Sequence, residues 1–323
     1  MSNNVDSSYG TPFDDVFRTL LEKCGNLIIP VINEVFGTDY SMDEEVTRLS
    51  NEHFVSDSDG NTSKRITNSC IKIRRKLYHI ECESNPDSSI EIRMIEYDFH
   101  IALTEAERGT YEHILTFPES AVLMLRHTSN TPDQLSIRLI LPDKSEATYT
   151  IPTVKVQEYV KEEIFDKKLL FFIPYYILRF EKRLQEINAE DEKVKQLASE
   201  YEDIYRMLIK LDISNTIGPN YLYDLVKLTR KLIEHVARDA ENIKREVIAM
   251  GGKVIDTGSD AIMERGISRG KAESIVELLE SKGEVSEALR EQIFGEQDIN
   301  DLSKWLKLSA KVSSVEEFIE QMD

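Results

Sequence analysis

The sequence predicts an α/β domain with the element order αβββαβ, followed by an α-helical C-terminal region. Three observations support this fold class. Apolar and polar residues alternate in consecutive segments between residues 46 and 83, which is typical of β-strands. Apolar residues recur at helical spacing on both sides of these segments, and after Pro152 the helical spacing dominates. The 323 residues, 41% of them hydrophobic, are enough for more than one hydrophobic core.

The composition predicts a cytoplasmic protein that is not embedded in a membrane. Because 59 acidic residues oppose 40 basic ones, the net charge of −19 repels nucleic acid except where a local basic surface reverses the sign. The three cysteines form no CxxC pair, which argues against a disulfide framework and a zinc site. The polar N-terminus lacks signal-peptide features. The most apolar run, Leu169 to Leu178, is about half the length that spans a bilayer.

Local signals predict the first elements. Thr11-Pro12-Phe13-Asp14 indicates a helix start with Thr as N-cap, Pro in the first turn and an acid near the positive end of the helix dipole. Residues 46–55 and 64–73 predict a β-hairpin around the turn Asp57-Ser58-Asp59-Gly60. The basic turn Arg74-Arg75-Lys76 leads into a third strand, 77–83. The buried stripe of the helix is predicted to be Val16, Phe17, Leu20 and Leu21.

A second helix is predicted after the third strand, because Ser88-Ser89-Ile90-Glu91 fits a capping box. The run 121–125 predicts a buried strand, and 135–141 with 147–151 predict a further hairpin. The predicted buried stripe of the second helix is Ile92, Ile95, Phe99, Ala102 and Leu103. Its predicted polar side is Arg93, Glu96 and His100.

The second half of the chain is predicted to be helical. Apolar residues repeat with spacings of three and four over 194–211 and again over 225–247, which predicts an antiparallel helical hairpin that ends at Gly251-Gly252. This hairpin is expected to pack against the α/β domain or to join two copies in a homo-oligomer. The predicted domains are 1–185, 186–252 and a small helical tail, 253–323.

Glu81 and Glu83 are the residues of the third strand that could carry chemistry. Alternate residues of a strand point to the same side about 7 Å apart, so both carboxylates could bind one hard cation such as Mg²⁺. A two-residue turn within 74–76 would place Asn68 beside them as a third oxygen ligand. The same pattern occurs on the solvated face of an ordinary strand, and the spacing by itself favours that interpretation.

Seven sequence segments give evidence on the function of Glu81 and Glu83 that their spacing does not. They are TPFDDVFRTLLE, SKRITNSCIKI, LYHIECES, RMIEYDFHIAL, FPESAVLMLR, NTPDQLSI and LLFFIPYYILRFEKRL, in that order. With them the chain resembles the Rpn family of recombination-promoting nucleases and transposase-like proteins, whose N-terminal domain belongs to the PD-(D/E)XK nuclease superfamily. The resemblance continues into VSEALREQIFGEQDINDLSKWLKL near the C-terminus. It implies a restriction-endonuclease-like αβββαβ core.

The resemblance also implies a metal-dependent DNA endonuclease that uses Mg²⁺ or Mn²⁺. Family members carry an aspartate on the second strand and Glu-x-Gln or Glu-x-Lys on the third, and here these positions are Asn68, Glu81 and Glu83. Only Glu81 matches fully, because Asn68 is neutral and Glu83 is an anion in place of an amide or amine. Two interpretations stay open: a rearranged site in which Glu83 supplies the second acid, and a decayed site.

Three further sets of residues lie in the predicted hairpin and the third strand. Glu52 is a candidate upstream metal ligand or a solvated glutamate in a polar strand. His79 shares a face with Glu81 and is assigned no role, because a lone histidine is most often simply hydrogen-bonded. A basic segment without acidic residues is a candidate contact for DNA phosphates, or else it keeps an edge hairpin soluble. Its members are Lys64, Arg65, Lys72, Arg74, Arg75 and Lys76.

The function that these observations favour is Mg²⁺-dependent cleavage of double-stranded DNA by metal-activated water. Two other classes stay open. A catalytically decayed relic would bind DNA through the basic segment without holding metal. A helical interaction protein would use the α/β domain as a scaffold and would show no salt-dependent DNA binding.

Overall fold

A computed structural model describes residues 11–49, 52–56, 62–66, 70–85, 89–214, 216–217, 221–296 and 298–322, with backbone alone for 52–56, 62–66, 213, 253–267 and 269. The chain divides into two compact units. The first unit comprises Met1–Met207 and Gly218–Gly251, and the second comprises Leu208–Ile217 and Gly252–Asp323. The α/β sheet and most of the helices that follow it therefore belong to one unit.

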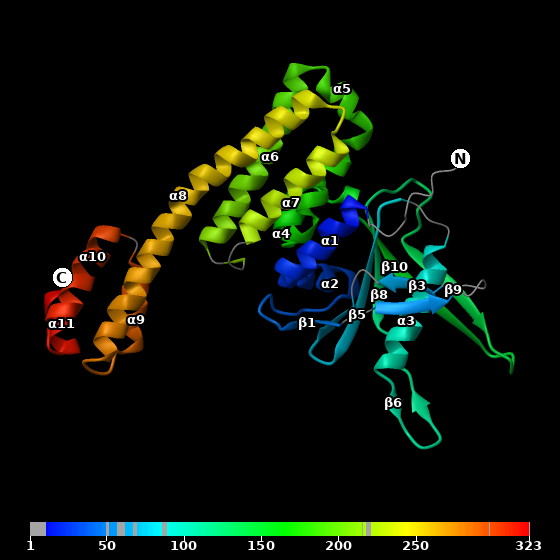
Figure 1. Cartoon of the computed structure of the whole chain (residues 1–323), viewed down its shortest axis with the longest axis horizontal. Helices are drawn as coiled ribbons and strands as arrows, with labels where there is room; N and C mark the ends of the chain where they lie inside the picture. The colour runs from blue at the N-terminus through cyan, green and yellow to red at the C-terminus, as the bar shows by residue number, and fades with distance from the viewer. Residues whose placement is uncertain are drawn as a thin grey trace. The chain divides into compact units, whose positions relative to one another are not determined.

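A six-stranded mixed sheet lies in the first unit, in the strand order β1-β4-β5-β8-β10-β9 (Figure 1). The first three strands form an antiparallel series, β8 pairs with β5 in parallel, and β10 pairs with β8 in parallel and with β9 in antiparallel fashion. The predicted α/β class is confirmed, and the described residues contain a strand at each predicted position. Their bounds are β1 Val46–Leu49, β4 Cys70–Ile73, β5 Lys76–Glu83, β8 Glu119–Met124, β9 Gln134–Ile140 and β10 Glu146–Lys155.

The predicted first hairpin is present as two paired sections. Strand β1 pairs with β4, and β2 (Glu52–Ser56) pairs with β3 (Thr62–Ile66). The predicted turn at 57–60 lies outside the described residues. Between β4 and β5 the pairing closes at Ile73 and Lys76, which leaves a two-residue turn. Arg74, its first residue, has a φ of 54°, as the tightest hairpin turns require.

Helix α1 (Pro12–Lys23) and the 3-10 helix η3 (Leu170–Arg183) cover one face of the sheet beside β5. The capping box predicted at Thr11 is confirmed, because the Thr11 side chain accepts from the Asp14 N–H and the Asp14 carboxylate accepts from the Thr11 N–H. The predicted apolar stripe of α1 is buried, and its Phe17 meets Phe171 of η3 at 5.4 Å between ring centroids. The run predicted to be a core segment is thus confirmed as buried η3.

Helix α3 (Ile90–Thr104) covers the other face. The predicted buried stripe is correct for Ala102, which is fully buried, and wrong for most of its other members. Ile92 and Phe99, predicted to be buried, are 54% and 46% exposed, and Leu103 is exposed as well. The helix instead packs through Ile90 and Met94 against β8, β9 and β10, and its N-cap is Ser89. The apolar residues of this segment lie around most of the helix, so their spacing did not select one face.

The helices after η3 differ in two respects from the predicted hairpin. Gly251 and Gly252 do not end a helix, because α8 runs through them without interruption. The Gly251 backbone passes close to the Tyr205 ring of α6, where an added Cβ would lie 3.4 Å from the ring. A helix break separates residues 225–236 from 241–247, so the second arm consists of two helices. The bounds are α4 Lys161–Asp166, α5 Leu184–Asn188, α6 Asp191–Ile213, α7 Tyr221–Val236 and α8 Glu241–Glu280.

The second unit has its own hydrophobic core. Residues of α8 such as Ile275 and Leu279 pack with Phe318, and Trp305 is partly buried against this cluster. The Trp305 indole donates a 2.8 Å hydrogen bond to the Met322 carbonyl. The helices that complete the unit are α9 Glu287–Gly295, α10 Ile299–Lys311 and α11 Val315–Gln321.

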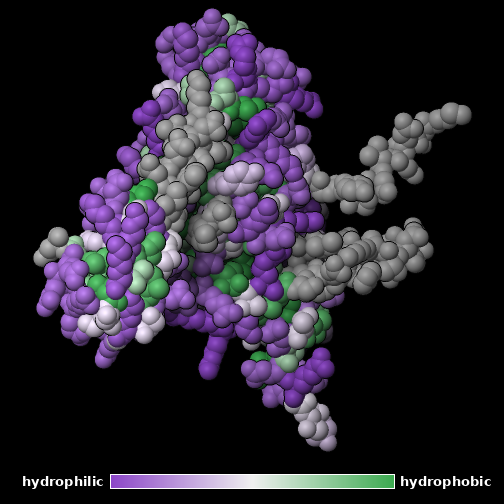
Figure 2. Space-filling model, turned by 60° about the vertical axis from the view of Figure 1, so that its left-hand side comes forward, coloured by the Kyte–Doolittle hydropathy of each residue, from purple (hydrophilic) through white to green (hydrophobic). Residues whose placement is uncertain are grey.

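Hydrophilic residues dominate the face drawn in Figure 2, with smaller hydrophobic groups between them. Across the described residues, no helix combines the length and the apolar character that crossing a membrane demands.

Candidate functional site

The candidate site is a group of polar side chains on β5, α3 and β10, which we call the Glu81 cluster: His79, Glu81, Asp98 and Tyr149. Glu81 is 5% exposed, and His79 and Asp98 are completely buried. The interpretation of Glu81 as part of a solvated strand face is therefore wrong. Both faces of β5 are covered, because Tyr78, Ile80 and Cys82 point toward the helices on the opposite side.

Hydrogen bonds connect the cluster in one line. His79 Nε2 lies 3.0 Å from Glu81 Oε1, and His79 Nδ1 lies 2.6 Å from Asp98 Oδ1. The Tyr149 hydroxyl of β10 donates to the other carboxylate oxygen of Asp98. Two residues of β5 are thus tied to α3 and to β10. The histidine is hydrogen-bonded, as expected for a lone histidine.

The charge of the imidazole follows from its neighbours. Ionised carboxylates only accept hydrogen bonds, so a histidine between two of them must donate from both ring nitrogens and carry a positive charge. Burial alone would lower the pKa of His79, but the hydrogen bonds that its ring donates to Asp98 and Glu81 outweigh burial and raise the pKa from 6.5 to about 9. The ring also packs edge-on against Tyr97 at 5.9 Å between centroids. At neutral pH the His79 ring therefore carries a positive charge.

Glu83, the second carboxylate of the strand, lies beside Glu81 at the end of β5. It is half-buried, and its Oε2 accepts a hydrogen bond from the Arg93 guanidinium of α3. Arg93, predicted on the polar side of its helix, is therefore a partner of the site. The formal charge of the cluster with Glu83 and Arg93 is about −1, because three carboxylates face one guanidinium and one imidazolium.

The side chains of the other two predicted ligands lie outside the described residues. Asn68 lies outside the described residues, and for Glu52 only the backbone is described, as the first residue of β2. Among the side chains that the structure describes, no group of three or more His, Cys, Asp or Glu has the arrangement of a metal site. Glu81 and Glu83 still offer the oxygen donors that Mg²⁺ prefers, and this ion commonly binds through one or two carboxylates while retaining waters. The donor chemistry fits a hard divalent cation.

The basic segment is partly neutralised by neighbouring acids. Lys72 contacts Glu105 at 3.4 Å and Lys76 contacts Glu119 at 2.9 Å. Arg74 pairs with Glu44, with 3.1 Å between its Nε and a carboxylate oxygen. Exposed ion pairs contribute only about 0–1 kcal/mol, so these cations can exchange a carboxylate for a phosphate. Arg75 is exposed, and the side chains of Lys64 and Arg65 lie outside the described residues.

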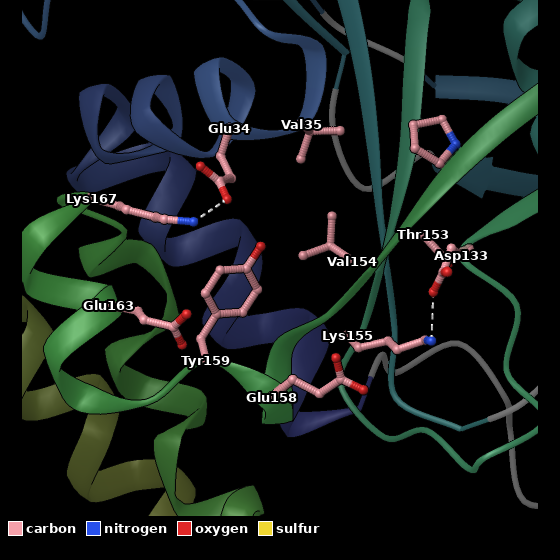
Figure 3. A pocket seen from close by; sticks show the side chains of 11 residues that line it. Glu34, Val35, Asp133, Thr153, Val154, Lys155, Glu158, Tyr159, Glu163 and Lys167 are labelled. Atoms are coloured by element: carbon pink, nitrogen blue, oxygen red, sulfur yellow. Dashed lines mark hydrogen bonds and ion pairs between the residues drawn. The ribbon is translucent and has the colours of Figure 1, made fainter.

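A separate pocket of about 480 Å³ lies beside β10 and α4 (Figure 3). Its two lysines are both engaged: Lys167 contacts Glu34 at 2.6 Å and Lys155 contacts Asp133 at 2.7 Å. Val35, Val154 and the Tyr159 ring lie between these ion pairs (Figure 3). The pocket includes no residue of the Glu81 cluster, so we do not assign the candidate chemistry to it.

No protein-family model, curated protein or solved structure matches the chain. The candidate site therefore rests on its own residues. Sequence reasoning found Glu81 and Glu83 but missed Asp98 and Tyr149. The available signal was Asp98 itself, an acid placed four residues after Met94 and three before Ile101, both of them buried.

Proposed function

We propose that the chain is a Mg²⁺-dependent DNA endonuclease of the Rpn type with a restriction-endonuclease-like core. The observation that carries this proposal is the burial of Glu81 in the third strand of the antiparallel series, where β5 also pairs in parallel with β8. An acid that is costly to bury persists there with organised hydrogen-bond partners, which is typical of a functional site. The element order of helix, three antiparallel strands, helix and parallel strand supports the same core.

The residues that would hold the cation are Glu81 and Glu83, with Asn68 as a neutral oxygen donor. A bound Mg²⁺ would lower the pKa of a coordinated water and stabilise negative charge on the phosphate. Glu81 would provide the main ligand, held in place by His79. Arg93 would keep Glu83 oriented and could exchange that ion pair for a phosphate oxygen.

DNA would approach along the basic segment at the β4–β5 turn. The overall charge of −19 opposes long-range attraction, so binding would depend on short-range contacts and fall steeply with salt. Lys72, Arg74 and Lys76 would have to release Glu105, Glu44 and Glu119 on binding. This exchange costs little because each of these pairs lies at the surface.

A DNA-binding protein without cleavage is the second candidate, and the Arg93–Glu83 ion pair favours it. The guanidinium already supplies a positive charge to Glu83. If Asn68 and Glu83 together fail to hold a cation, the fold would retain only the basic segment. The two candidates differ in metal dependence and agree in DNA binding.

The test is nicking and linearisation of supercoiled plasmid by the purified full chain with Mg²⁺ or Mn²⁺. The comparison includes Glu81→Gln, Asn68→Asp and, as a matched control, Glu146→Ala, an exposed strand glutamate. Cleavage by the wild type and the control that is lost in Glu81→Gln would support the nuclease. A silent wild type that Asn68→Asp activates would identify a nuclease disabled at that position.

If neither the wild type nor any variant cleaves plasmid, a DNA-binding measurement separates the remaining candidates. Salt-dependent DNA binding without cleavage would support the second candidate. No binding at low salt would contradict both, and would leave the helical interaction protein as the explanation.

A further inference from the structure

The further inference concerns how Glu81 is held. A metal-ligating carboxylate must present its oxygens in one orientation, and in metalloproteins this orientation is usually fixed by residues that bind the ligand without touching the metal. His79 stands two residues before Glu81 on the same face of β5, and its Nε2–H reaches the Glu81 carboxylate at 3.0 Å. The partner that fixes Glu81 therefore comes from the same strand.

Asp98 fixes the histidine in turn. It accepts from His79 Nδ1 at 2.6 Å and is anchored in α3, where Met94 and Ile101 on either side of it are buried. The Tyr149 hydroxyl holds the second Asp98 oxygen from β10. With both oxygens engaged and no exposure to solvent, the Asp98 carboxylate has one orientation, and it imposes one on the imidazole.

We propose that His79 and Asp98, supported by Tyr149, are positioning residues that orient the Glu81 carboxylate for binding a divalent cation. This inference rests on the proposed function, since it assigns these residues to the same site. It extends the site from β5 to α3 and β10. None of the three would contact the cation or the substrate.

The experiment measures Mn²⁺ binding to the full chain by electron paramagnetic resonance, together with plasmid cleavage as a function of metal concentration. In His79→Asn and Asp98→Asn the half-saturating metal concentration should rise by about 10- to 100-fold, the usual cost of losing an outer partner of a metal ligand. Cleavage at saturating metal should be much less affected, because the ligand itself remains.

A conservative variant separates positioning from structural support. The amide nitrogen of Gln reaches the place of His Nε2, whereas that of Asn does not, so His79→Gln should recover part of the metal affinity that His79→Asn loses. Tyr149→Phe keeps the ring and should raise the half-saturating concentration by a few-fold. The matched control is Asp212→Asn, a buried carboxyl of the second unit, which should leave metal affinity unchanged.

The outcomes distinguish this inference from the proposed function. If the wild type binds and cleaves but His79→Asn, Asp98→Asn and Tyr149→Phe keep its metal affinity, the positioning role is overturned and the nuclease stands. If Asp98→Asn does not fold, the His79→Gln and Tyr149→Phe series decides. A wild type that binds no Mn²⁺ and cleaves nothing overturns both.

Discussion

Asp98→Ala should be among the most destabilising single substitutions in the first unit. The variant leaves the His79 Nδ1–H and the Tyr149 hydroxyl without their acceptor, and a buried unsatisfied donor costs about 1–3 kcal/mol. It also leaves the His79 imidazolium without its closest counter-charge, and breaking a buried charge pair costs about 3–5 kcal/mol. These costs overlap because they describe the same contacts. We expect a loss of about 3–5 kcal/mol in the free energy of unfolding.

The assay is urea denaturation at pH 7 followed by far-UV circular dichroism. Trp305, the only tryptophan, lies in the second unit, so its fluorescence follows that unit separately. Asp133→Ala serves as the control, because Asp133 is 94% exposed and its ion pair with Lys155 should contribute no more than about 1 kcal/mol. A loss below about 1 kcal/mol in Asp98→Ala, or one no larger than the control's, would refute the buried charge pair.

Three further predictions concern the fold. Gly252→Ala should stabilise the protein by up to about 1 kcal/mol, because Gly252 lies in the interior of α8 with no atom near an added Cβ; destabilisation on thermal melting would argue against a continuous helix. In denaturant unfolding, Met94→Ala should lower the free energy of unfolding by about 2–5 kcal/mol and Ile92→Lys by less than about 0.5 kcal/mol, because Met94 is buried and Ile92 is exposed. A larger loss in Ile92→Lys would support the buried face of α3 that the sequence predicts. Burial raises the pKa of Cys24 to about 12, so its thiol stays protonated at pH 8. A thiol-reactive dye should label the native protein slowly and the denatured protein at once, and rapid native labelling would contradict the buried state of Cys24, Cys70 and Cys82.

The local parts of the fold could be predicted from the sequence. The α1 capping box and the two-residue β4–β5 turn each depend on a few adjacent residues, and both are present. The orientation of α3 could not be predicted, because apolar residues occur on more than one side of it and only tertiary packing selects among them. Gly251-Gly252 predicts a helix end from local sequence, but α8 continues through both residues, and Gly251 lies against the Tyr205 ring.

Part of the candidate site could also be predicted from local sequence, and part could not. Glu81 and Glu83 were found because alternation along one strand is a local pattern. Asp98 lies 19 residues after His79 and Tyr149 a further 51 along the chain, so only the folded structure brings them together. The burial of Glu81 also depends on α3 lying over β5, and no local pattern indicates that.

The most direct test of the Glu81-centred site is an anomalous difference map from a crystal of the protein soaked in Mn²⁺. A peak within about 2.5 Å of a Glu81 carboxylate oxygen, absent from crystals of Glu81→Gln, is the result that we predict. A crystal that shows Mn²⁺ only at sites away from Glu81, from protein that cleaves plasmid, would contradict the assignment.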